Sequence, residues 1–155
     1  MSIDHLVYSV PDLDQGMDQI ATFLGIRPVF GGYHLTKGTK NALLNLGNGT
    51  YLELLAIDHN NQEIHPPRWM GIDLISEPKL TRWALKSEDL TEVSQHLKRF
   101  NPIMGEVEGG QRKKTDDSLL RWELIKPLPE PEVDLAPFYV DWSKSDSHPT
   151  ESLEE

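Results

Sequence analysis

Two segments of the chain repeat one order of predicted elements, and this repeat constrains the fold more than any single motif. In the first segment, alternating side chains predict a strand at residues 3–10, and a capped amphipathic helix follows at 12–25. Three more strands follow, of which the last two form a hairpin around the Asn48-Gly49 turn. The first unit therefore has the order β–α–β–β–β and ends near residue 58.

The same order returns in the second half of the chain. Asp89 and Glu92 repeat the capping-box spacing of Asp12 and Gln15, at the start of a second amphipathic helix. The runs SLLRWELI and PFYVDW then correspond to the last two strands of the first unit. A duplicated unit explains the matching caps and the matching order better than chance does.

We therefore expect two modules, at residues 1–58 and 79–142, joined by a polar, proline-containing connector at 59–78. A single helix covers a four-stranded sheet poorly, so the two modules should join edge to edge. The predicted fold class is α+β: tandem βαβββ modules that form a cupped mixed sheet with the helices on its convex face.

Composition narrows the class of partner. The 155 residues carry 25 acidic and 15 basic side chains, a formal net charge of −10, which disfavours nucleic acid and anionic membranes as partners. The chain has no cysteine, so thiolate nucleophiles and thiolate metal ligands are excluded. It shows no secretion signal and no apolar run of about 18 residues. We expect a cytoplasmic protein that binds a small molecule, with a homodimer allowed.

His5 interrupts the apolar row of the first strand. Alternation puts it on the face of Ile3 and Val7, and puts Asp4 on the opposite face. One interpretation is a core histidine with backbone partners, and the other is a metal ligand or general base. The residues of the strand alone do not decide between the two.

The chain resembles the vicinal oxygen chelate superfamily, and within it the glyoxalase-like proteins. Five motifs in order carry the resemblance: IDHLVYSVPDLD, NALLNLGNGTYLELLA, PPRWMGID with EPKLTRWAL, LLRWELIKP and PFYVDW. The pair His148-Pro149 also looks like a family feature just past the last strand. The resemblance thus implies a glyoxalase-like domain over residues 1–149, followed by an acidic, disordered tail at 150–155.

The resemblance further implies a metal site on the cup floor. Carried over residue by residue, His5 and Glu53 match as ligands, and Asp141 follows if YVD is aligned with YLE, with a one-residue register error allowed. Arg82 stands where the second module should supply a ligand, and a guanidinium offers no lone pair to a metal. Two interpretations stay open: zinc, manganese or iron held by these three side chains, or no metal, with the charge of Arg82 in its place. We favour the second.

The implied function is a glyoxalase-like enzyme acting on a vicinally oxygenated substrate, with His5, Glu53 and Asp141 as candidate catalytic residues. The alternative is a metal-free binding or sequestering protein of the same fold. Candidate substrate contacts are Arg82, Arg68, Trp69 and Arg121. The basic run Arg112–Lys114 lies near Asp116 and Asp117, and we interpret it as a solvated loop.

Overall fold

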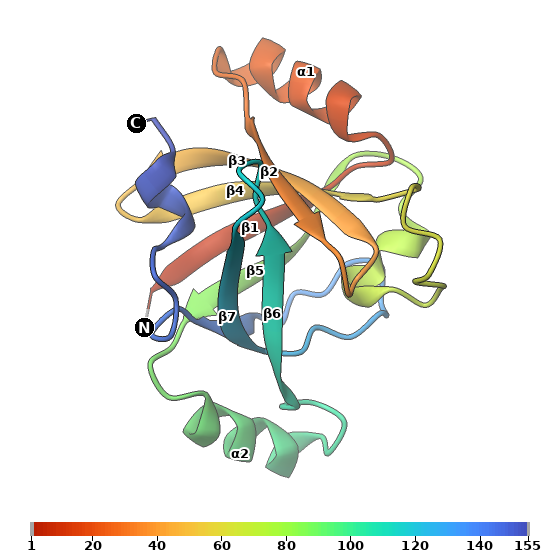
Figure 1. Cartoon of the computed structure of the whole chain (residues 1–155). Coiled ribbons are helices and arrows are strands. Elements are labelled where there is room, and N and C mark those ends of the chain that lie inside the picture. Colours follow the sequence, from red (N-terminus) through yellow and green to blue (C-terminus); the bar gives the residue numbers. More distant parts are fainter. Residues whose placement is uncertain (1, 155) are drawn as a thin grey trace.

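A computed structural model describes residues 2–154 (Figure 1). In this range the chain forms eight strands, two α-helices and two short 3-10 helices. The strands are β1 (Ile3–Ser9), β2 (Val29–His34), β3 (Thr39–Gly47), β4 (Thr50–Ile57), β5 (Lys79–Lys86), β6 (Val107–Lys113), β7 (Leu119–Ile125) and β8 (Phe138–Asp141). The helices are α1 (Leu13–Leu24), α2 (Leu90–Phe100), η1 (Trp69–Leu74) and η2 (Pro149–Ser152). The class is mixed α+β, and the order β–α–β–β–β occurs twice.

The strands form one closed barrel in the order β1-β4-β3-β2-β6-β7-β8-β5. The two halves of the chain meet where β1 pairs with β5, in antiparallel orientation. On the other side β2 and β6 meet through one residue pair, Tyr33 with Lys113. We predicted an open cup, and the difference arises because these two edge strands use each other's unpaired backbone groups.

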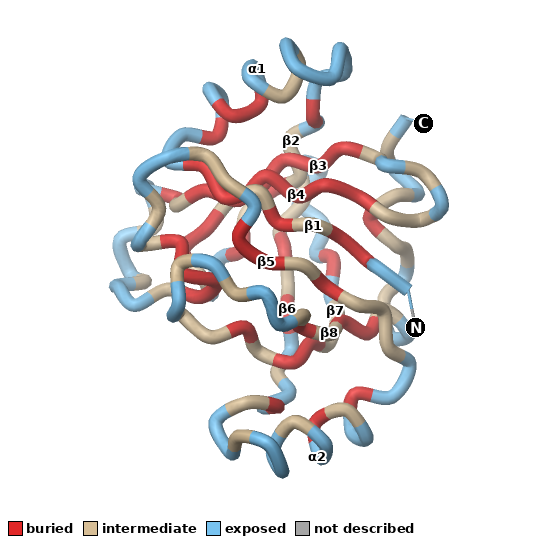
Figure 2. Tube along the Cα trace, turned by 180° about the vertical axis from the view of Figure 1, so that it is seen from behind, coloured by how far each residue is buried: buried red, intermediate tan, exposed pale blue. Residues whose placement is uncertain are grey.

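Both α-helices lie outside the barrel, at opposite ends of the molecule (Figures 1 and 2). The predicted caps are present: Asp12 accepts a hydrogen bond from the backbone of Gln15, and Asp89 accepts two from Thr91 and Glu92. Helix α1 packs its apolar face on the outer side of β3 and β4. The buried residues of this outer cluster are Val10, Leu13, Met17, Ala42, Leu44, Leu52, Leu54 and Ala56. No helix within residues 2–154 has the length and apolar character needed to cross a membrane.

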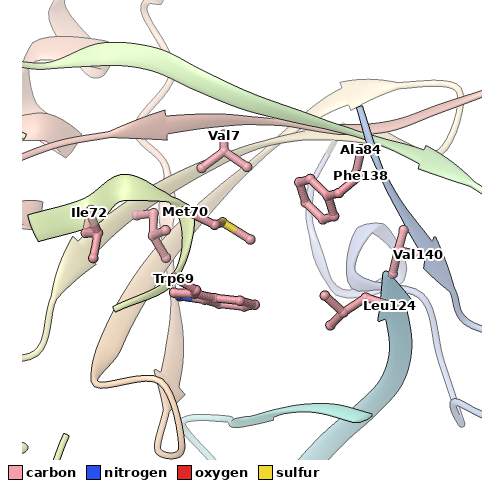
Figure 3. Close-up of a cluster of buried hydrophobic side chains, with 9 residues drawn as sticks. Val7, Trp69, Met70, Ile72, Ala84, Leu124, Phe138 and Val140 are labelled. Carbon is pink, nitrogen blue, oxygen red and sulfur yellow. The ribbon is translucent and has the colours of Figure 1, made fainter. Parts of the chain in front are cut away.

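A second cluster fills the inside of the barrel, and part of it comes from the predicted connector. Trp69 and Met70 of η1 point toward side chains of β5, β7 and β8 (Figure 3), and Ile72 belongs to the same buried cluster. Met70 and Gly71 have left-handed backbone conformations, with φ of 58° and 65°. A Cβ atom on Gly71 would come within 2.7 Å of the Pro131 carbonyl oxygen, so only glycine fits this bend. Residues 69–72 of the predicted connector are therefore part of the core.

The C-terminal segment also differs from the prediction. Residues 150–152, expected in a disordered tail, belong to η2. His148 caps this helix: its ring accepts a hydrogen bond from the backbone N–H of Thr150, and its backbone N–H donates to the Glu151 carboxylate. Pro149 is buried against the barrel interior. The reciprocal cap and the buried proline order a segment whose composition alone indicated disorder.

Candidate functional site

The inside of the barrel encloses a small cavity of about 20 Å³. Besides two histidines, five aromatic residues line it: Tyr51, Trp69, Trp122, Phe138 and Trp142. Its polar lining residues are His5, His34, Asn41, Tyr51, Glu53 and Arg112. This volume holds about one water molecule, so the interior is polar and nearly filled.

The structure brings together His5 and Glu53, the two ligands predicted from the first module. Nε2 of His5 lies 3.6 Å from Oε2 of Glu53, and both side chains are buried. The two residues come from the parallel neighbours β1 and β4, where alternation turns them to the inner face. The His5 ring stacks on Tyr51 at a centroid distance of 4.7 Å and meets the edge of Phe138. Two groups that carry lone pairs thus face each other across the cavity.

Asp4 holds the His5 ring from behind. Its Oδ1 lies 2.6 Å from Nδ1 of His5, and its Oδ2 lies 3.1 Å from Nε1 of Trp142 and 3.1 Å from Nε2 of His148. Burial acts to raise the pKa of Asp4, but the hydrogen bonds and charges of His148 and His5 outweigh it and hold the pKa well below its usual range. An ionised carboxylate only accepts, so Nδ1 of His5 donates and Nε2 is left facing Glu53.

The sequence prediction missed Asp4 because simple alternation puts it on the face opposite His5. The register of β1 against β5 shifts between Ile3 and His5, and such a bulge re-aims a side chain. The available signal was an acidic residue directly before a histidine in a buried strand, since buried carboxylates need partners.

A second set of polar groups surrounds the other oxygen of Glu53. The amide Nδ2 of Asn41 donates to Oε1 of Glu53 at 2.7 Å, and Oδ1 of Asn41 accepts from Nη1 of Arg112 at 3.3 Å. Nε2 of His34 lies 3.8 Å from the same Oε1. The side-chain amide of Asn41 therefore links the guanidinium of Arg112 to the carboxylate of Glu53 through two hydrogen bonds.

His34 is held neutral. Burial lowers its pKa to about 3, and the nearby charge of Arg112 acts in the same direction. Trp69 donates to the hydroxyl of Thr39, whose own proton can then point to Nδ1 of His34, 3.0 Å away. This arrangement puts the ring proton of His34 on Nε2, directed toward Glu53.

This buried neutral histidine predicts an acid sensitivity. The unfolded chain protonates His34 below pH of about 6.5, whereas the folded chain does so only near pH 3, so stability falls as the pH drops through this window. Between pH 7 and 4.5 we expect the wild type to lose about 2–3 kcal/mol more unfolding free energy than His34→Gln. Urea denaturation at both pH values measures it, with exposed His96→Gln as control. Parallel pH profiles for wild type and His34→Gln would contradict the assignment.

Arg112 corrects the interpretation of the basic run as a solvated loop. It lies on β6, its side chain is 4% exposed, and it lines the cavity. Gly31 on β2 leaves room for it: a Cβ atom there would come within 2.5 Å of Nη1 of Arg112 and Oδ1 of Asn41. The available signal was the glycine pair of β2, which marks a close approach in a strand.

Asp141 does not join His5 and Glu53. It lies at the end of β8 opposite Glu123 of β7, and its Oδ1 accepts a hydrogen bond from the backbone of Ser143. The strand pairing shows why. In the first half, His5 pairs with Tyr51, two residues before Glu53.

In the second half, Ala84 pairs with Phe138, two residues before Val140. If the two halves are aligned by these pairs, Ala84 and Val140 correspond to His5 and Glu53, and Asp141 lies one residue beyond the cavity-lining Val140. The second half of the barrel supplies apolar side chains where the first supplies polar ones.

The sequence predicts the charge of Arg82 beside the His5–Glu53 pair, in place of a metal ion. The structure has Arg82 elsewhere. Its guanidinium donates to backbone carbonyls of Thr81, Pro131 and Glu132. Residues 131 and 132 belong to the segment that connects β7 with β8. Arg82 thus fastens this segment to the barrel.

We expect Arg82→Met to lower the unfolding free energy by about 3 kcal/mol, because one buried and several partly buried backbone carbonyls lose their donor. Urea denaturation measures the change. Arg99→Met on the exposed face of α2 is the matched control. A cost below about 0.5 kcal/mol, the size usual for a surface substitution, would contradict this role.

The remaining predicted contacts lie in different places. Trp69 lines the cavity, and its role as a substrate contact stays a prediction. Arg68 directly precedes η1 and is not among the residues that line the cavity; it pairs with Asp73 and donates to the Ile64 carbonyl at 2.8 Å. Arg121 is exposed on β7, between the inward-facing Leu120 and Trp122.

The donor set fits a metal only in part. His5 and Glu53 are suitable ligands, and Asp4 behind His5 matches the carboxylate that usually orients a ligating imidazole. Catalytic zinc sites take three protein ligands, and no cluster of three histidine or acidic side chains suited to a metal occurs within residues 2–154. His34 directs a proton, not a lone pair, at Glu53. The described residues therefore do not complete the predicted three-ligand site.

Comparison with known proteins places the chain. The sequence profile of the glyoxalase-like domain family matches residues 3–155. The chain belongs to this family. Among curated protein sequences, none matches this glyoxalase-like domain.

Solved structures share the fold at low sequence identity. A hypothetical protein from Staphylococcus aureus has a TM-score of 0.68 and 24% identity, over 97% of this chain and 62% of that one. This glyoxalase-like domain thus spans less than two thirds of that relative. Methylmalonyl-CoA epimerase from Mycobacterium tuberculosis has a TM-score of 0.56 and 20% identity, over 90% and 87%. A methylmalonyl-CoA epimerase variant from Streptomyces coelicolor, in complex with 2-nitronate-propionyl-CoA, has a TM-score of 0.58 and 15% identity, over 95% of this chain and 98% of that one.

Proposed function

We propose that this glyoxalase-like domain is an enzyme that moves a proton on a small, vicinally oxygenated substrate. The observation that carries the proposal is the pair His5 and Glu53, whose Nε2 and Oε2 face each other at 3.6 Å in a buried cavity. Asp4 behind His5 fixes the ring, which a packing histidine does not need. Buried, oriented acid–base pairs are typical of proton-transfer sites.

The chemistry follows from the two groups. Glu53 takes the proton from a carbon next to a carbonyl, the C–H electron pair becomes the new carbon–carbon π bond, and the carbonyl π pair moves to its oxygen. His5 accepts the proton of the neighbouring hydroxyl at Nε2, and the negative charge of Asp4 stabilises the imidazolium that forms. Delivery of the Glu53 proton to the former carbonyl carbon, and of the His5 proton to its oxygen, isomerises the substrate. Delivery of one proton to the opposite face of the original carbon, with the hydroxyl and the carbonyl restored, epimerises it.

His34 and Arg112 can stabilise the substrate carbonyl oxygen, which becomes negatively charged when Glu53 takes the proton. His34 directs its Nε2–H into the same region, and Arg112 adds a full charge near Asn41. Donors arranged in advance in a water-poor site stabilise such an oxygen more than they would in water. No step in this scheme requires a metal, in line with the incomplete ligand set.

The fold neighbours support the reaction class. Two of them are named as methylmalonyl-CoA epimerases, and epimerisation inverts one carbon centre. We therefore propose proton transfer at carbon for this chain, without assigning it their substrate. The cavity of about 20 Å³ also requires that a substrate displace lining side chains. Met70 is the most adaptable of them, because its unbranched thioether chain repacks easily.

The test is a panel of 2-oxoaldehyde thiol adducts, catechols and small 2-hydroxy carbonyl compounds, incubated with and without added zinc, manganese or iron. We expect turnover of at least one 2-hydroxy carbonyl compound without added metal. The absence of turnover across the whole panel would refute the enzyme proposal.

A second candidate is a non-catalytic binding protein of the same fold. The observation that favours it is the incomplete ligand set, because the second half of the barrel supplies Ala84 and Val140. A ligand that binds only the native state raises the melting temperature. A panel compound that raises the melting temperature and forms no product would favour this candidate.

A further inference from the structure

Arg112 is the buried cation of the barrel interior, and its bonding is incomplete. It lines the cavity and is 4% exposed. Within residues 2–154, Nη1 makes one long hydrogen bond, 3.3 Å to Asn41, and Nε has no partner. A guanidinium has five N–H donors, and a buried donor without a partner costs free energy. The group is therefore arranged for an acceptor that the protein itself does not supply.

Two other arginines, half-buried Arg68 and buried Arg82, show the contrast. Nε of Arg68 and Nε of Arg82 also have no partner. Arg68 nevertheless forms an ion pair with the Asp73 carboxylate, and Arg82 donates to several backbone carbonyls. Arg112 has no carboxylate within ion-pair distance in the described part of the chain, because the amide of Asn41 stands between it and Glu53.

Building on the proposed function, we propose that Arg112 binds the carboxylate of the substrate, so that the substrate class is small 2-hydroxy carboxylates. A guanidinium matches a carboxylate with two parallel hydrogen bonds, and Arg is the residue best suited to this pairing. The ligand's negative charge enters beside Glu53, and Arg112 offsets the repulsion between the two carboxylates.

The geometry connects recognition with chemistry. One amide group, that of Asn41, bridges Arg112 to Glu53 through bonds of 3.3 and 2.7 Å. A compact ligand with its carboxylate on Arg112 therefore presents its next carbon to the side of the cavity where Glu53 and His5 lie. The small cavity selects ligands of few atoms, and the net charge of −10 makes one inward-facing cation distinctive for an anion.

The test compares acids with their neutral amides. Glycolate and lactate, and glycolamide and lactamide, are titrated into the wild-type protein by calorimetry at pH 7. We expect the acids to bind about ten- to a hundredfold more tightly than the matched amides, the range for hydrogen bonds to a charged group. Equal affinities of acid and amide for the wild type would overturn the proposal without any variant.

Variants locate the effect. Arg112→Met is expected to bind acid and amide alike, and Arg112→Lys, which keeps the charge but loses the planar fork, to keep part of the preference. Exposed Arg99→Met should keep it in full. An acid preference that persists in folded Arg112→Met would refute the role of Arg112. Acid binding through Arg112 without turnover would refute the enzyme proposal alone, and turnover of neutral compounds without acid preference would refute this inference alone.

Discussion

Glu53→Gln is expected to lower turnover of a panel substrate by about 10²–10⁴-fold, the range usual for loss of a general base. The substitution keeps the shape of the side chain, and its carbonyl oxygen can still accept the hydrogen bond that Asn41 donates to Glu53 at 2.7 Å. What it removes is a group that can take a proton. Because substrate binding does not depend on that proton, KM should change much less than kcat.

Steady-state kinetics of the wild type and Glu53→Gln give the comparison. Glu63→Gln is the matched control, since Glu63 is exposed in the connector far from the cavity lining. Melting curves exclude a folding defect. Turnover that survives Glu53→Gln unchanged would mean that the base lies elsewhere.

Asp4→Ala is expected to lower the unfolding free energy by about 3–5 kcal/mol, the range for removing one partner of a buried charged network. Three donors lose their buried acceptor at once: Nδ1 of His5, Nε1 of Trp142 and Nε2 of His148. The His5 ring also loses the group that orients it, so kcat should fall together with stability. The melting temperature should drop by about 10 °C.

The stability difference between the wild type and Asp4→Ala should depend on pH in one direction. The pKa of Asp4 is lower in the folded than in the unfolded state, so its contribution is complete above the unfolded value, near 4, and is lost as the pH falls toward the folded value. The gap between wild type and Asp4→Ala should thus shrink below pH 4. Urea denaturation measures it, with exposed Asp146→Ala as control. A gap that grows with acid would contradict the network.

Local patterns in the sequence predicted much of the fold. The capping pairs at Asp12 and Asp89 placed both α-helices, because a cap depends only on residues within one turn. Alternation turned His5 and Glu53 inward, and the structure has them 3.6 Å apart. These features are local or follow from the period of a strand.

Features that depend on pairing between distant strands were not predictable in the same way. Asp141 was placed one residue out of register, and a slip of one residue exchanges the inner and outer faces of a strand. The bulge at Asp4 also depends on how β1 meets β5. The charged neighbours of Arg112 indicated a solvated loop, but Arg112 is buried, and the close approach of Gly31 on the distant strand β2 leaves room for it.

Exchange of the substrate's carbon-bound hydrogen with solvent tests proton transfer by Glu53 and His5 most directly. A 2-hydroxy carbonyl compound that binds the wild type is incubated in D₂O, and the proton signal of the carbon next to the carbonyl is followed by NMR. We expect the signal to disappear with the wild type and to persist with Glu53→Gln. A signal that persists with the wild type although the compound is bound would contradict proton transfer at this site.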